Sequence, residues 1–303
     1  MLNNKHITRI YSHPTPRLFK FSLLRGIPIP SKYRQISQTP NATHKQLSTM
    51  APAKPWADGP FKLIPTPLFT QGPDKPVDQY VTVASQMAIA HNTMIRALNS
   101  IYLQAPHVKP EDYKDFIGYS LCWYQLITNH HRGEEDRFFP QIEEKTEKGL
   151  MEVNVEQHHA FEAGIESYNT YLQSLLPTGT SFSAPKLLAI IDSFAPALTT
   201  HLADEIPSLL SLRRYGDALP LGKLAAIEFQ KVGMGAVRTE GGHMFFVNLD
   251  RGFEGGLWRN FPAIPAPVRF VLTRVFGKWN AGWWKFAPLD YDGNRKELYA
   301  LGD

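Results

Sequence analysis

The sequence predicts an all-α protein whose central part, residues 78–214, is an up-down-up-down four-helix bundle. Four consecutive segments carry apolar residues at the spacing of an α-helix. The connections between them, at about 105–111, 145–150 and 177–184, are short, so sequential helices are expected to be antiparallel neighbours. Each of the four apolar stripes also contains one histidine, which suggests that the interior of the bundle holds more than a hydrophobic core.

The first two helices are expected over about 78–104 and 110–139. Asp78 has the side chain of an N-cap for the first helix, and Pro140 is expected to bend or interrupt the second. The first stripe consists of Ala84, Met87, Ala88, His91, Met94, Ile95, Leu98, Ile101 and Tyr102. The second stripe consists of Phe116, Trp123, Leu126, Ile127, His130, Glu134 and Phe138.

The third and fourth helices are expected over about 150–176 and 184–214. Pro196 and Pro207 lie inside the fourth helix and are expected to kink it, because each removes a backbone donor. The third stripe consists of Val155, His158, Phe161, Ile165, Tyr168 and Leu172. The fourth consists of Leu188, Ile191, Phe194, Leu198, His201, Glu205, Leu209 and Leu212.

The segments on either side of the bundle differ from it in composition. Residues 1–50 form a basic leader with eight Lys or Arg and no Asp or Glu, which matches a mitochondrial transit peptide. The alternative is a disordered basic tail ahead of a second start at Met50, so the mitochondrial matrix and the cytoplasm are both expected locations. Residues 51–77 contain seven prolines and are expected to form a linker.

The C-terminal part, residues 215–303, is rich in Gly, Pro and aromatic residues and is expected to be an irregular extension that caps the bundle. Only 266–278 suggests helical periodicity. The segment 266–285 offers an alternative role, which is contact with a membrane surface. No window of the sequence is long and apolar enough for a transmembrane helix.

Charge and cysteine content exclude several classes of function. Outside the leader the chain has 24 basic and 28 acidic residues, a net charge of −4, which argues against nucleic acid as a partner. The single cysteine, Cys122, rules out an internal disulfide and a Cys-rich zinc site. It lies in an apolar run, where packing explains it.

Histidine and glutamate positions in the four stripes predict a metal centre. His91, His130, His158 and His201 are expected at similar depth, one on each helix. Four buried imidazoles need polar partners that apolar neighbours do not supply. Two of these histidines have a glutamate four residues later on the same helix face, Glu134 and Glu205. A pair of di- or trivalent ions would offset the cost of burying these carboxylates, and imidazole with carboxylate suits iron, manganese or zinc.

The same residues carry a resemblance to a known family. The segment HHRGEEDRFFP at 130–140 resembles the H-x-x-x-E-E…F-P signature of the hemerythrin-like, or HHE cation-binding, family. Gln157 to Phe161 is similar to the third-helix histidine segment of that family, and His201 to Glu205 is similar to its closing H-x-x-x-E. The resemblance covers about residues 78–214. It implies two irons per chain, with zinc or manganese as alternatives, on His91, His130, Glu134, His158, His201 and Glu205.

Two departures from the oxygen-carrying members of this family bear on function. The position of their second third-helix histidine is Asn154 or Glu162 here, and the fourth helix has a shorter spacing from histidine to carboxylate. The resemblance therefore implies a more open, carboxylate-rich site rather than reversible oxygen carriage. The expected partner is O₂, NO or peroxide, or iron itself, and whether turnover follows is left open. The alternative is a non-catalytic interaction domain with structural zinc or no metal.

Several ligand choices have a close competitor. His131 with Glu135 is spaced like His130 with Glu134, and His130 is preferred because apolar residues share its helix face. His159 competes with His158, and Asp204 competes with Glu205. Glu162, four residues after His158, is either a further ligand or a surface acid. His243, in the C-terminal part, is expected to bind no metal.

Overall fold

The computed structural model describes residues 54–176, 182–237 and 241–302. The leader 1–50 and its transit-peptide interpretation lie outside these residues. Within them every regular element is a helix, as the sequence predicts, and the one β-bridge joins Leu289 to Arg295. None of the helices in this part of the chain combines the length and the apolarity that crossing a bilayer requires.

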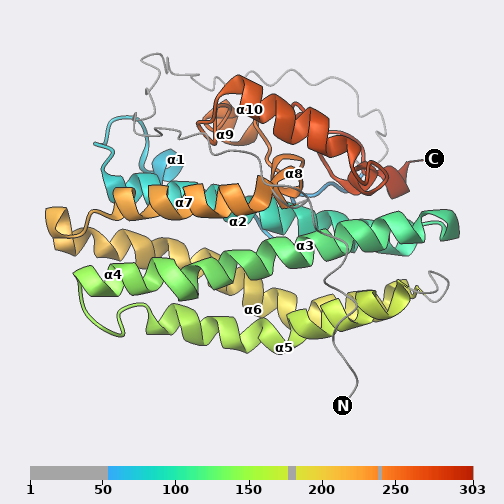
Figure 1. Cartoon of the computed structure of the whole chain (residues 1–303), viewed down its shortest axis with the longest axis horizontal. Helices are drawn as coiled ribbons and strands as arrows, with labels where there is room; N and C mark the ends of the chain where they lie inside the picture. Colours follow the sequence, from blue (N-terminus) through green and yellow to red (C-terminus); the bar gives the residue numbers. More distant parts are fainter. Residues whose placement is uncertain (1–53, 177–181, 238–240, 303) are drawn as a thin grey trace, which may run out of the picture.

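Four long helices form the body of the molecule (Figure 1). The α-helices are α1 (Pro67–Gln71), α2 (Gln79–Gln104), α3 (Tyr113–Gly133), α4 (Phe139–Lys145), α5 (Glu152–Leu175), α6 (Ala184–Ser211), α7 (Leu221–Val237), α8 (Gly241–Phe246), α9 (Phe253–Gly256) and α10 (Ala266–Phe270). The 3-10 helices are Ala105–His107, Pro110–Asp112, Leu212–Ala218, Phe276–Lys278, Trp283–Phe286 and Tyr299–Leu301. The π-helices are Glu134–Phe138 and Val271–Val275.

The long helices begin where the sequence offers caps. The side chain of Asp78 accepts a hydrogen bond from the backbone N–H of Val81 at the start of α2, and Ser183 caps α6 in the same way. Helix α6 is continuous through Pro196 and Pro207. Between α3 and α4 the chain makes one π-turn, in which the N–H of Phe139 donates to the carbonyl of Glu134. Pro140 follows Phe139, so the interruption of the second helix that the sequence predicts is this π-turn.

The core lies between α2, α3, α5 and α6. Helix α2 packs against α6 and α3, and α5 packs against the same two helices. Their apolar stripes form one continuous cluster that includes Trp123, Tyr168 and Phe194, each at most 1% exposed. This packing fixes the rotation of each helix about its axis, and so decides which polar side chains point inward.

The C-terminal part is more regular than its composition suggests. The expected irregular extension is wrong for 221–237, which form the helix α7 packed against α2 and α3. Gly222, Gly233 and Gly235 lower the helix propensity of this segment, which explains why the sequence indicates it weakly. A second apolar cluster, built around Trp258 and Phe261, joins the C-terminal part to Ile89 of α2.

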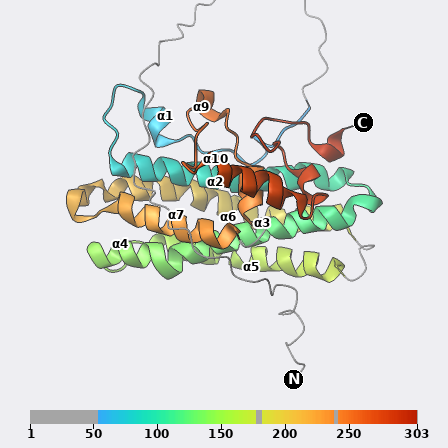
Figure 2. The same ribbon diagram turned by 45° about the horizontal axis from the view of Figure 1, so that its top comes forward.

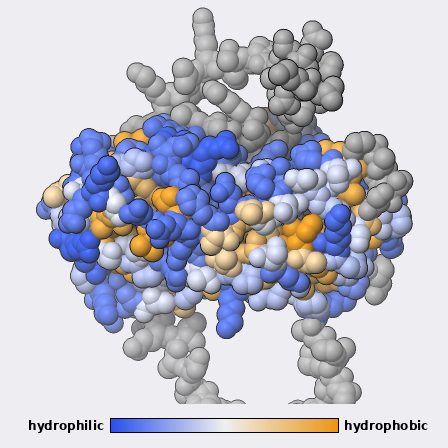
Figure 3. Space-filling model, turned by 90° about the horizontal axis from the view of Figure 1, so that it is seen from below, coloured by the Kyte–Doolittle hydropathy of each residue, from blue (hydrophilic) through white to orange (hydrophobic). Residues whose placement is uncertain are grey.

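The views in Figures 1 and 2 place the last part of the chain, coloured red, on the side of α2 that faces away from α5. Helix α5 forms the opposite edge of the molecule, and Figure 3 shows that edge, where apolar residues are scattered among hydrophilic ones.

Candidate metal centre

Seven histidine and glutamate side chains from all four long helices meet inside the bundle. Helix α2 supplies His91, α5 supplies His158, and α6 supplies His201 and Glu205. Helix α3 and the π-turn after it supply His130, His131 and Glu134. These side chains form two groups, and in each group one ligand atom per residue lies within 4.8 Å of all the others.

The first group contains His91, His130, Glu134 and Glu205. The Nε2 atoms of His91 and His130 are 2.9 Å apart. Oε2 of Glu205 lies 3.3 Å from Nε2 of His91, and Oε1 of Glu134 lies 3.1 Å from Nε2 of His130. The side chains of His91 and Glu205 are fully buried, so bulk water does not reach Nε2 of His91 or the carboxylate of Glu205.

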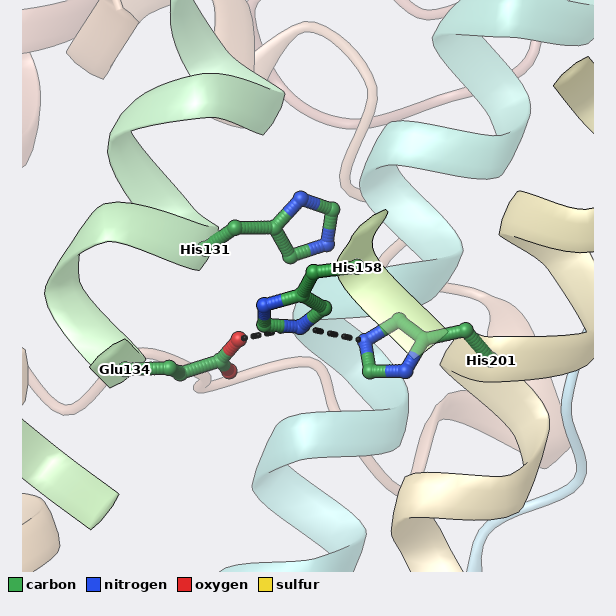
Figure 4. Close-up of side chains that lie close together, drawn as sticks. All are labelled: His131, Glu134, His158 and His201. Carbon is green, nitrogen blue, oxygen red and sulfur yellow. Dashed lines mark hydrogen bonds and ion pairs between the residues drawn. The ribbon is translucent and has the colours of Figure 1, made fainter. Parts of the chain in front are cut away.

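The second group contains His131, Glu134, His158 and His201 (Figure 4). The Nε2 atoms of His158 and His201 are 2.9 Å apart, and Oε2 of Glu134 lies 3.7 Å from Nε2 of His158. The ring of His131 lies against that of His158, with 4.3 Å between ring centroids. Glu134 belongs to both groups, and its two oxygens face different histidines. This is the position of a carboxylate that bridges two ions.

Partners outside the cluster determine which ring nitrogens carry hydrogen. Nδ1 of His91 faces the carbonyl oxygen of Leu202 at 2.8 Å, and a carbonyl can only accept. Nδ1 of this ring therefore carries its hydrogen, and a neutral ring then has a free lone pair on Nε2. Glu135 faces Nδ1 of His158 in the same way, since a carboxylate is also an acceptor. In both rings the lone pair of Nε2 points into the cluster.

His201 is held by a chain of two polar residues. The amide nitrogen of Gln157 donates to Asp204 at 3.3 Å, so the amide oxygen is the atom that faces Nδ1 of His201 at 3.1 Å. Nδ1 of His201 then donates, and Nε2 has a lone pair. As a result two lone pairs, on His158 and His201, face each other at 2.9 Å without a hydrogen between them. A cation between these nitrogens removes the repulsion, and outer partners of this kind are typical of metal-binding histidines.

The buried carboxylates also fit a cation. Neither oxygen of Glu134 or Glu205 accepts a hydrogen bond from any described residue, and both side chains are at most 3% exposed. An unpaired buried carboxylate is strongly destabilising, so the group needs either a proton or a positive ion. Burial, with the nearby charge of Glu205 second, raises the pKa of Glu134 well above its usual range.

Burial favours the neutral form of four of the imidazoles, the form that binds a metal. Burial is the main cause that lowers the pKa of His130 and His131 well below the usual value, and the neighbouring imidazoles add to it. Burial likewise lowers the pKa of His201 to about 2. The pKa of His158 is lowered by burial, although Glu135 opposes the shift.

The structure brings together all six residues that the sequence selects, and it adds His131. The preference for His130 over His131 does not separate the two rings, because His131 is 7% exposed and lies in the second group. The reason is local: Glu134 follows His131 by three residues and His130 by four, and both spacings place side chains on one helix face. The sequence contains both spacings, which was the available signal.

The competing residues lie outside the cluster. His159, Glu162 and Asp204 are exposed and belong to neither group. Asn154 is buried but is likewise in neither group. His243 is buried in the C-terminal part, where its Nδ1 faces the carbonyl of Leu272 at 3.1 Å. The assignment of the seven side chains as ligands remains a prediction that metal analysis can test.

Known proteins resemble this chain in sequence. The protein "Dimeric xanthone biosynthesis cluster protein R11" of Cryptosporiopsis sp. (strain 8999) is 35% identical over 250 residues, which cover 81% of this chain and 93% of that protein. No solved structure matches the chain. The family model described as "Hemerythrin HHE cation binding domain" matches residues 82–210, a range that contains every member of the cluster. The chain belongs to the hemerythrin HHE cation-binding domain family.

Proposed function

We propose that this protein holds two iron ions on the seven clustered side chains and that the pair binds or reacts with O₂, NO or peroxide, or handles iron itself. One observation carries the proposal: Nε2 of His158 and Nε2 of His201 lie 2.9 Å apart while Nδ1 of each ring faces an oxygen acceptor, an arrangement that a cation bound by both Nε2 atoms stabilises. The donor set of imidazole and carboxylate suits iron, with manganese or zinc as alternatives.

Each ion would have its own ligands and share one. His91, His130 and Glu205 would hold the first ion, and His131, His158 and His201 would hold the second. Glu134 would bridge the two ions, since each of its oxygens faces one group. Bound iron supplies redox chemistry toward small molecules. The chain's own part is to keep the imidazoles neutral, to hold the hydrogens on the outer nitrogens and to exclude bulk water.

We propose the up-down-up-down arrangement for the four helices that carry these side chains. Short connections join α2 to α3 and α4 to α5, and each helix packs against two of the others. The C-terminal part would then close the face of α2 that lies away from α5, through the apolar cluster around Trp258. A bundle of this kind places ligands from facing helices at one level, which a shared ion pair requires.

The name of this relative helps to choose between reversible oxygen carriage and a catalytic role. That protein is named as a member of a dimeric xanthone biosynthesis cluster. This favours a role for the metal pair in a biosynthetic reaction, or in support of one, over reversible oxygen carriage. The ligand set agrees, because α5 supplies only one inward histidine and the further imidazole comes from His131 of α3.

Metal analysis of protein purified in air without added metal tests the proposal. Two irons per chain are expected, with absorption in the near ultraviolet and visible that changes after dithionite. Zinc or an empty core is colourless and would contradict iron. His130→Ala and Glu205→Ala should lower metal content and stability together. His159→Ala and His243→Ala should leave the metal content unchanged, and equal metal in all four variants would refute the ligand assignment.

A further inference from the structure

The segment from Ala266 to Trp279 exposes an apolar face to solvent among the described residues. Helix α10 continues through the π-turn 271–275 into the 3-10 turn 276–278. Four large apolar side chains of this segment are exposed: Phe270 by 61%, Val271 by 39%, Val275 by 45% and Trp279 by 60%. Exposed pairs recur every four residues, at 270 and 271, 274 and 275, and 278 and 279, so they form one stripe. We call this stripe the 270–279 face.

The opposite side of the same segment is packed against the protein, so the segment cannot rotate to bury its exposed side chains. Leu272 is 7% exposed and belongs to the apolar cluster around Trp258. Gly277 lies directly against His243, since a Cβ at that position would be only 2.4 Å from Cε1 of the imidazole. The helix is therefore fixed in rotation, and turning its outer apolar side chains inward would break this packing.

The sequence segment that contains the 270–279 face carries charge of one sign. Residues 255–289 contain five Lys or Arg and no Asp or Glu. Two of these cations, Arg274 and Lys278, are exposed among the apolar side chains of the face. Arg274 also pairs with Asp292 at 2.7 Å, but both side chains are largely exposed, so the pair is weak and open to other anions.

We propose that the 270–279 face docks on the surface of an anionic lipid bilayer. A helix lies in the membrane interface when apolar and aromatic side chains on one face are accompanied by cations. Tryptophan favours the headgroup level, where Trp279 would lie, while Phe270 and Val271 would enter the acyl boundary. Arg274 and Lys278 would contact anionic headgroups. A partner protein would need an equally apolar patch of opposite charge, whereas a bilayer supplies both properties everywhere.

The location of the face agrees with this role. Figures 1 and 2 place the last part of the chain, coloured red, on the side of α2 that faces away from α5. Docking there leaves α5 in solution, together with the surface that Figure 3 shows. The metal centre stays untouched, so lipid binding and metal content can be measured independently in the same protein.

Vesicle co-sedimentation of the full chain tests the proposal. The probes are vesicles of phosphatidylcholine alone and of phosphatidylcholine with phosphatidylserine, and binding only to the second is expected. Trp279→Ser should weaken binding about tenfold or more, through the loss of buried apolar area. Arg274→Gln and Lys278→Gln should each weaken it about fivefold. All of these side chains are exposed, so the thermal unfolding and the metal content of the variants should match those of the parent.

Matched controls lie on other helices. Val153 of α5 is 64% exposed and Lys186 of α6 is also exposed, so Val153→Ser and Lys186→Gln should leave vesicle binding unchanged. The basic residues 1–50 are the same in every variant and cannot produce a difference between them. The proposal is overturned if the parent does not bind anionic vesicles or if Trp279→Ser binds as the parent does. It is also overturned if Trp279→Ser changes only the oligomeric state in light scattering, since the face would then join two copies of the chain.

Discussion

Nδ1–H of His158 on helix α5 donates a hydrogen bond to Glu135 in the π-turn after α3, at the edge of the metal centre. The side chain of Glu135 is 37% exposed and that of His158 only 5%, so the pair connects the solvent side with the cluster. The carboxylate holds a hydrogen on Nδ1 of the imidazole. This leaves the lone pair of Nε2 available inside the bundle, 2.9 Å from Nε2 of His201.

We therefore expect Glu135→Gln to lower metal affinity about tenfold or more without removing a ligand. The amide is neutral and can present a donor to Nδ1, which weakens the control of the imidazole tautomer. Competition with a chromophoric chelator measures the affinity. Glu162→Gln is the matched control, because Glu162 is an exposed acid of α5 outside both groups. Equal affinities of the two variants would show that Glu135 does not position His158.

His131→Ala should remove one of the two ions. The second group would keep only His158, His201 and the shared Glu134, whereas the first group keeps all four members. Elemental analysis should fall from about two metals per chain to about one, in a protein that remains folded. His159→Ala changes an exposed imidazole of α5 outside both groups, and this variant should retain two metals per chain. Two metals per chain in His131→Ala would mean that this ring only packs against His158.

The sequence predicts the four helices well because each carries a complete local signal. Asp78 is confirmed as the N-cap of α2, and the inward stripes place His91, His158 and His201 in the cluster. Periodicity alone suffices here, since a helix with one apolar face has only one way to bury it.

Periodicity could not resolve the end of α3. His130 and His131 are adjacent, and a stripe assigns only one of two neighbours to a face. The π-turn that begins at Glu134 changes the rotation of the helix just after these two histidines. No residue type in the sequence predicts this π-turn. The prediction for the second helix therefore includes Glu134, which lies in both groups, and omits His131, which lies in the second. The spacings to Glu134 allow either ring to face inward, and the contact of His131 with His158 of α5, which the stripe does not contain, shows that both do.

His243 makes stability depend on pH apart from the metal centre. Burial lowers its pKa to about 4, while the hydrogen bond to the carbonyl of Leu272 opposes the shift. Between pH 4 and about 6.5 the unfolded chain then binds more protons at this residue than the folded chain. The unfolding free energy should fall as the pH decreases through this range, by up to about 3 kcal/mol from this group.

The measurement is urea unfolding of metal-depleted protein at several pH values between 7 and 4, for the parent and for His243→Gln. Glutamine does not titrate, so the unfolding free energy of the variant should fall less steeply with decreasing pH. Groups of the metal centre titrate identically in both proteins, and their contribution cancels in the difference between the two slopes. Parallel curves would mean that His243 is protonated as easily in the folded chain as in the unfolded one.

Arg96 of α2 should contribute more to stability than any exposed cation, because it joins three parts of the chain inside the protein. Its side chain is 1% exposed and contacts Asp58 at 3.2 Å and Asp250 at 3.6 Å. Asp250 is 3% exposed, so removing the guanidinium leaves a buried carboxylate with Arg295 as its remaining cation. We expect Arg96→Met to lower the unfolding free energy by about 3 kcal/mol in urea titrations.

The matched control for Arg96 is Arg213→Met. Arg213 pairs with Asp78, but the two side chains are 55% and 39% exposed, so we expect a loss under about 1 kcal/mol. A large loss in Arg96→Met with a single unfolding transition would mean that the bundle and the C-terminal part unfold together. Equal losses of unfolding free energy in the two variants would contradict the larger contribution of Arg96. Separate transitions in the parent would show instead that the C-terminal part is an independent unfolding unit.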